Sequence, residues 1–187
     1  MHTPKKEFHI YIIPLSFSDH KLLTELQSVL KETFRLPVSF LNRSFPLEEG
    51  KDFTRNQYNS TWILSKILKE IPEEGCKVLA VTTVDLYIPV LTYVFGEAQL
   101  DGKAAVVSTY RLRDELYGLP ENPQKLKERL HKEAVHELGH TFGLIHCQKP
   151  QCVMYTYSYA EEIDFKSINF CKDCLNFLEN KKRKYIF

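Results

Sequence analysis

The N-terminal half of the chain alternates between strand-like and helix-like patterns of apolar residues. EFHIYIIPL (7–15) is rich in β-branched and aromatic residues and predicts a strand. From Leu22 to Phe34 apolar residues recur every three or four positions, behind Ser18 or Asp19 as a helix N-cap. The alternation predicts an α/β fold in which strands and helices form layers.

The same pattern continues towards the middle of the chain. We expect a strand at 37–45, a polar connection at 46–55, an amphipathic helix at 56–71 and a strand at 76–90. The last of these begins as a nearly continuous apolar run, which is typical of a strand buried on both faces. Two β-rich runs within 91–112 flank Asp101-Gly102, a turn pair that predicts a hairpin.

The C-terminal part changes character at Gly143. A helical pattern covers 122–141, with Pro123 in the first turn, and periodicity then stops until a short helix at 172–182. We expect one domain over 1–187, with an N-terminal subdomain (1–143) that contains the sheet and a C-terminal subdomain (144–187) that is rich in cysteine.

Composition narrows the class of partner. The chain has 187 residues, 43% of them hydrophobic, which suits one core. Its 25 Lys and Arg balance 24 Asp and Glu, so no global field attracts nucleic acid or an anionic membrane, the KKRKY tail being a local exception. The chain lacks a signal-peptide pattern and any apolar run of about 20 residues. We expect a cytoplasmic monomer, with no membrane or nucleic-acid partner.

HELGHTFGLIH (136–146) has the spacing of a metal site. On a helix, residues four apart share a face, so His136 and His140 can reach one ion. Glu137 lies about 100° from His136 around the helix, which suits a general base beside the metal. His131 points about 140° away from His136 and is left out of the site.

His146 can join these two histidines only if the helix ends before it. Gly143 provides the means, because glycine adopts a left-handed φ without steric cost. We expect Leu144 and Ile145 to anchor the reversing chain in the core.

Three imidazoles leave a tetrahedral Zn²⁺ one open position, which is the arrangement of catalytic zinc sites. Water bound there has its pKa lowered towards about 7, and Glu137 would take its proton and pass it to the leaving amine. The implied reaction is hydrolysis of an amide bond without a covalent intermediate.

The cysteines predict a second zinc site. Cys147, Cys152, Cys171 and Cys174 form two closely spaced pairs, an arrangement typical of a closed, structural Cys₄ zinc; four unrelated thiols are the alternative. Cys147 directly follows His146, so we expect the second zinc to help fix the third histidine. Cys76 stands alone and is read as a small buried apolar residue.

These residues resemble the archaemetzincins, a branch of the metzincin metallopeptidases. Three histidines match the catalytic zinc ligands of that family, Glu137 its general base, Gly143 its turning glycine and Met154 its turn methionine, while the four cysteines match its second zinc site. The resemblance implies a metzincin-like fold with a mixed, mostly parallel twisted sheet. It also implies that FGEA (95–98) is an antiparallel edge strand above the cleft, where a peptide would pair with its main chain.

The leading hypothesis is therefore a two-zinc metallopeptidase that acts on peptides, with aminopeptidase action suggested by some relatives. The alternative is a zinc-stabilised binding protein whose peptidase site is idle or covered by YTYSY (155–159). A nucleic-acid module built on the cysteines and the basic tail is disfavoured by the neutral charge balance. Packing is the expected role of Tyr155, Tyr157 and Tyr159.

Overall fold

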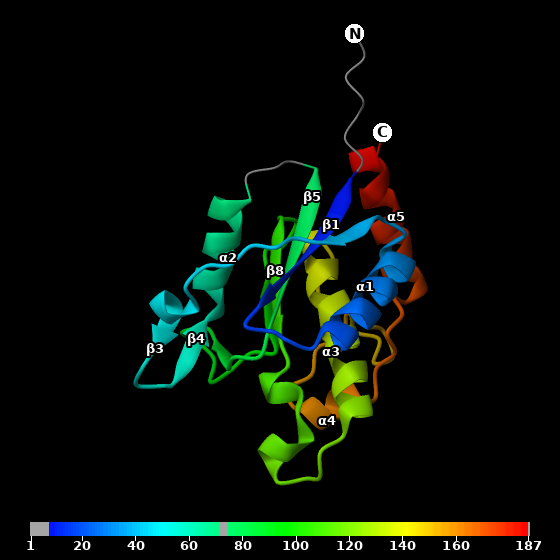
Figure 1. Cartoon of the computed structure of the whole chain (residues 1–187). Coiled ribbons are helices and arrows are strands. Elements are labelled where there is room, and N and C mark those ends of the chain that lie inside the picture. The colour runs from blue at the N-terminus through cyan, green and yellow to red at the C-terminus, as the bar shows by residue number, and fades with distance from the viewer. Residues whose placement is uncertain (1–7, 72–74, 187) are drawn as a thin grey trace.

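A five-stranded sheet lies at the centre of the computed structural model, which describes residues 8–71 and 75–186 (Figure 1). In spatial order its strands are β2 (Val38–Phe40), β1 (His9–Leu15), β5 (Cys76–Thr82), β8 (Ala104–Ser108) and β7 (Gly96–Ala98). All neighbours are parallel except β7, which pairs antiparallel with β8 at the edge. The predicted mixed sheet with an antiparallel edge strand is confirmed.

Helices cover both faces of this sheet (Figure 1). The helices α1 (His20–Phe34) and α3 (Pro123–Thr141) lie on one face and α2 (Ser60–Glu70) on the other. Successive residues of β5 point alternately into the two layers, Leu79 towards α1 and α3 and Ala80 towards α2. All seven residues of β5 are buried, as its continuous apolar run predicts.

The helix and hairpin signals correspond to real caps and turns. The Asp19 side chain accepts a hydrogen bond from the backbone N–H of Leu22 at 2.9 Å, so Asp19 is the N-cap of α1. Asn122 caps α3 in the same way, with Pro123 as its first residue. Asp101 adopts a left-handed φ of 53° in the turn between β7 and β8. Glu7, the first residue of the predicted first strand, lies outside the described residues.

The boundaries of the predicted second helix and third strand are wrong because a second, smaller sheet intervenes. It consists of β3 (Lys51–Asp52), β4 (Gln57–Asn59) and β6 (Leu86–Tyr87). The helix expected from 56 begins at Ser60, since the Asn59 side chain accepts from Trp62 N–H at 3.0 Å and caps it there. The strand expected to reach 90 ends at Thr82, and its later residues pair with β4 instead.

Other elements differ from expectation in length. The second strand stops at Phe40, because it lies at the sheet edge and its pairing ends where Leu41 N–H donates to Ile12 O. The remaining helical elements are η1 (Leu47–Gly50), η2 (Tyr110–Leu112), η3 (Asp114–Tyr117), α4 (Ala160–Ile163) and α5 (Lys172–Ile186). Of these, η1 lies in the expected polar connection, α4 was not predicted, and α5 extends past the expected end at 182. No described helix combines the length and apolar character needed to span a bilayer.

Candidate functional site

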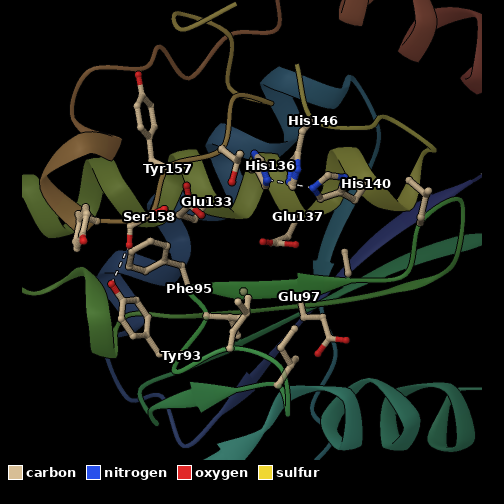
Figure 2. A pocket seen from close by; sticks show the side chains of 18 of the residues that line it. Tyr93, Phe95, Glu97, Glu133, His136, Glu137, His140, His146, Tyr157 and Ser158 are labelled. Carbon is tan, nitrogen blue, oxygen red and sulfur yellow. Dashed lines mark hydrogen bonds between the residues drawn. The ribbon is translucent and has the colours of Figure 1, made fainter. Parts of the chain in front are cut away.

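Three histidines converge beside the C-terminal end of α3. His136 and His140 project from the helix, and His146 approaches from the segment that follows it (Figure 2). One ring nitrogen from each lies within 4.8 Å of those of the other two, and the Nε2 atoms of His136 and His140 are 3.0 Å apart. The structure thus brings together the three predicted histidines and leaves His131 outside the group.

The chain reverses at Gly143 as expected. Its φ is 91°, and the N–H groups of Gly143 and Leu144 donate to carbonyls of the last helical turn. Leu144 is buried, but Ile145 is 69% exposed, so the expectation that both anchor the chain in the core is wrong for Ile145. Ile145 instead lines the cleft, next to His146.

Hydrogen bonds orient two of the rings. The carbonyl oxygen of Val153 accepts from His136 Nδ1 at 2.8 Å, and that of Leu144 accepts from His140 Nδ1 at 2.7 Å. Burial lowers the pKa of all three histidines, which favours neutral rings. With the proton on Nδ1, the Nε2 lone pairs of His136 and His140 face each other and need an electrophile between them. The donor set therefore suits a metal ion.

Glu137 lies in the same cleft, between the histidines and the edge strand β7 (Figure 2). Its side chain is buried, and burial, reinforced by the charge of Glu133, raises the pKa of its carboxyl well above the usual value. Gly96 of β7 permits this close approach: a Cβ there would lie 2.7 Å from Glu137 Cγ and 2.6 Å from Val106 O. The cleft has a volume of about 750 Å³.

The edge strand β7 offers free main-chain groups to the cleft. Ser108 N–H donates to Phe95 O at 2.8 Å, and Gln99 N–H donates to Ala104 O at 3.0 Å, so alternate residues of this stretch bond to β8. The N–H and C=O groups of Gly96 and Ala98, between them, point away from β8. An extended peptide can pair with this edge.

A carboxylate on β7 anchors the strand to the neighbouring helix. Glu97 accepts hydrogen bonds from Ser60 Oγ at 2.5 Å and from Thr61 Oγ1 at 2.9 Å, both in the first turn of α2. The edge strand is thereby held from the side opposite α3.

The tyrosine-rich segment forms a wall of the cleft and leaves His146 exposed. Tyr157 and Tyr159 line the cleft, while Tyr155 packs against Tyr157 with ring centroids 4.8 Å apart. The Tyr157 ring points away from the three histidines (Figure 2). The described residues of this segment therefore do not cover the site, which was one of the two forms of the alternative hypothesis.

Two charged residues of the cleft were missed from the sequence. Glu133 and Lys166 form an ion pair of 2.7 Å and both line the cleft. Glu133 could have been found, because it lies one turn before Glu137 on the same helix. Lys166 could not, because the unpatterned segment between Gly143 and α5 gives no indication of its direction.

The four predicted cysteines also converge. Their sulfur atoms lie within 4.8 Å of one another, and the Sγ atoms of Cys147 and Cys171 are 3.8 Å apart. Burial alone would raise the pKa of Cys171, but hydrogen bonds from Cys174 and Cys147 lower it to about 7, which favours the metal-binding thiolate. Cys76 lies apart, buried at the start of β5. The cluster could hold a second metal ion.

The loop between the two clusters is tied together by hydrogen bonds. Cys147 N–H donates to Met154 O at 2.9 Å, which closes a loop containing both Cys152 and Val153. Met154 is fully buried against α3, where a Cβ on Gly139 would lie 2.5 Å from its sulfur. One short segment thus supplies sulfur atoms to one cluster and a carbonyl that orients His136 in the other.

Comparison with known proteins agrees with this geometry. The family model for peptidase family M54 matches residues 15–180. An archaemetzincin from Methanocaldococcus jannaschii is 41% identical over 172 residues, which are 92% of this chain and 93% of that one. An archaemetzincin from Pyrococcus furiosus is 40% identical over 147 residues, 78% of this chain and 73% of that one.

Solved structures extend the likeness to three dimensions. A zinc-dependent peptidase from Methanocorpusculum labreanum superposes with a TM-score of 0.81 at 33% identity, covering 90% of this chain and 99% of that one. The archaemetzincin of Methanopyrus kandleri gives 0.80 at 32% identity, covering 97% and 99%. The chain belongs to the archaemetzincins, peptidase family M54, a family of zinc-dependent peptidases.

Proposed function

We propose that this chain hydrolyses peptide bonds at the three-histidine site, with Glu137 as the general base. The observation that carries the proposal is the convergence of three neutral imidazoles beside a buried carboxylate, in an open cleft bordered by a free strand edge. The second candidate, a zinc-stabilised binding protein with a covered or idle site, lacks such an observation.

In this proposal His136, His140 and His146 hold the catalytic zinc. The ion would supply Lewis acidity for the attacking water and for the scissile carbonyl. Glu137 takes a proton from the water and gives it to the leaving amine, a transfer favoured because burial raises the pKa of its carboxyl well above the usual value. The two Nδ1 hydrogen bonds keep the ring nitrogens of His136 and His140 aimed at the ion.

The proposed substrates are peptides held along β7. The outward N–H and C=O groups of Gly96 and Ala98 would pair with the peptide main chain, and antiparallel pairing is the more stable arrangement. A bound peptide then crosses the cleft directly opposite Glu137, since Gly96 lies against that side chain.

A second zinc, held by the four cysteines, completes the proposal. Four thiolates leave no open coordination position, so this ion has a structural role. The two separate clusters support a count of two zinc ions per chain.

The test combines zinc analysis with a peptide library. We expect two zinc ions per chain and cleavage by the wild type, and a loss of activity of at least about a hundredfold in Glu137→Gln with zinc retained. Glu128→Gln, the same change on an exposed residue of α3, is the control and should keep full activity. Aminopeptidase action further predicts that acetylating the peptide N-terminus abolishes cleavage.

Two outcomes would contradict the proposal. An active Glu137→Gln variant would exclude this residue as the base. Two bound zinc ions without cleavage of any library peptide by the wild type would favour the binding protein.

A further inference from the structure

One end of the cleft contains a buried ion pair that the proposed reaction does not use. Lys166 Nζ lies 2.7 Å from Glu133 Oε1, and the two side chains are 1% and 7% exposed. Lys166 also donates to Tyr155 O at 3.2 Å. Both charged residues line the cleft, and Glu133 lies beside His136 on the side away from His140 (Figure 2). Burying two charges costs desolvation free energy, so stabilising the fold is a weak explanation for this pair.

The segment that carries Lys166 is fixed to α3 next to this pair. Arg129, one turn before Glu133, donates to both carboxylate oxygens of Asp164 at 2.7 and 2.8 Å. Lys132 donates to the carbonyl oxygens of Ile163 and Asp164 at 3.1 and 3.2 Å. The ion pair therefore belongs to a preformed wall.

The direction of β7 decides which part of a substrate reaches this wall. Gly96 lies against Glu137, and Asp101, just beyond the strand, donates its N–H to His140 O at 2.9 Å. The strand thus runs beside α3 in the same direction, with Phe95 at the Glu133 end. A peptide antiparallel to β7 has its C-terminal half at that end.

We propose that Glu133 and Lys166 form the end of the pocket for the substrate side chain that follows the scissile bond, and that they select a neutral polar side chain, an amide or a hydroxyl. This inference rests on the proposed peptidase function and on antiparallel pairing with β7. The inference specifies the kind of residue that follows the scissile bond, which the proposed hydrolysis reaction does not determine.

The charges of the pair carry the argument for this class. A carboxylate offers several acceptor sites and an ammonium three donors; Lys166 donates one hydrogen bond to Tyr155 O, and Glu133 Oε1 has the ion pair but no hydrogen-bond partner among the described residues. An acidic side chain would meet Glu133 and a basic one Lys166, each at close range in a buried site where like charges repel strongly. An apolar side chain would remove water from both charges without replacing its hydrogen bonds. A neutral group with a donor and an acceptor satisfies both.

The test is a peptide library that varies the residue after the scissile bond, with products read by mass spectrometry. We expect the wild type to cleave before Asn, Gln, Ser or Thr at least about tenfold faster than before acidic, basic or large apolar residues. Acidic, basic or apolar preference in the wild type would overturn the inference.

Charge-removing variants should shift the preference in opposite directions. Glu133→Gln leaves Lys166 as a lone cation and should favour acidic residues by about tenfold over wild type, whereas Lys166→Met should favour basic ones by a similar factor. The controls Glu128→Gln and Lys172→Gln change exposed residues and should leave the profile unaltered. Unaltered profiles in both cleft variants would overturn the inference.

A double variant covers the case in which either single variant fails to fold. Glu133→Leu with Lys166→Met replaces the pair by apolar groups, a change that buried ion pairs often tolerate. Its preference should move to apolar residues, and a retained polar preference would overturn the inference. Cleavage that ignores the varied position refutes the inference alone, whereas absence of cleavage by the wild type refutes the proposed function and this inference with it.

Discussion

At Gly96 the absence of a side chain decides how close the edge strand can come to the Glu137 carboxylate. Any Cβ at this position would overlap both Glu137 and the backbone of β8, and the backbone cannot give way as the end of a flexible side chain can. The strand and α3 are consequently in direct contact in the cleft where we propose that a substrate lies. Adding a single Cβ at Gly96 should therefore disturb the geometry of the proposed reaction more than the stability of the fold.

We therefore expect Gly96→Ala to lower kcat/KM by at least about tenfold, because displacing Glu137 or β7 by about 1 Å is enough to misalign the reacting groups. The thermal midpoint should fall by only a few degrees, about what 1 kcal/mol costs a chain of this size. Steady-state kinetics and a thermal melt on the same preparation measure both. Wild-type kcat/KM in the variant would show that the close approach is dispensable.

At the level of elements, the loop from Cys147 to Met154 connects the two clusters. Its carbonyl at Val153 orients His136, its first residue follows His146, and Cys152 Sγ accepts from Cys171 N–H at 3.3 Å at the start of α5. Metal bound at the cysteines would hold this loop in place. The three histidines and the four cysteines are thus linked through one short loop.

Replacing Cys171 and Cys174 by Ser should therefore weaken zinc retention at the histidines as well as removing the second zinc. Losing the support of a ligand's hydrogen-bond partner typically lowers metal affinity by about 10 to 100-fold. Chelator competition monitored by zinc release measures this effect. Cys76→Ala is the matched control, and histidine-site affinity equal to wild type in the double variant would show that the clusters are independent.

The predictions from sequence succeeded where the pattern is local. The spacing from His136 to His146, the left-handed turn at Gly143 and the helix N-cap expected at Ser18 or Asp19 depend on a few adjacent residues. The histidines converge, Gly143 has a left-handed φ, and Asp19 is the cap. The small sheet of β3, β4 and β6 was missed, because its strands are two or three residues long and form only by pairing with one another. Lys166 was missed for the same reason: its place in the cleft depends on contacts distant in the sequence.

For the molecule as a whole, Arg129 joins three parts of the chain around α3. Its side chain is 1% exposed and bonds Asp114 at 2.6 Å, Asp164 at 2.7 Å and Leu112 O at 2.9 Å. These contacts tie the segment after β8 and the short helix α4 to the helix that carries the histidines. The wall of the cleft therefore depends on a charge buried behind it.

We expect Arg129→Met to reduce the free energy of unfolding by about 3 to 5 kcal/mol, because both carboxylates lose their buried partner. Urea denaturation followed by circular dichroism measures the loss. Asp173→Asn, which breaks the exposed ion pair with Lys149, is the control and should change stability little. A comparable loss of unfolding free energy in the two variants would show that the buried network stabilises the fold no more than the exposed ion pair does.

The same network predicts how stability depends on pH. Burial alone would raise the pKa of Asp164, but the hydrogen bonds and charge of Arg129 lower it below its usual value of about 3.8. A carboxyl with a lowered folded pKa stabilises the fold above its unfolded pKa, and this contribution is lost as pH falls through the folded value. Melts from about pH 6 to 2 should show a steeper acid decline in the wild type than in Asp164→Asn. Parallel curves would exclude this contribution.

The short edge strand β7 restricts the conformation that a protein substrate can have when it binds. The strand is three residues long and contacts α3, so a substrate pairs with it as one extended segment. A helix, or a strand already paired on both sides, has no free main-chain groups to offer β7. On the proposed function, a folded target must first open locally, and the free energy of that opening weakens its apparent affinity. Which cellular proteins are cleaved would then depend on how readily a segment unfolds locally, as well as on the amino-acid sequence of that segment.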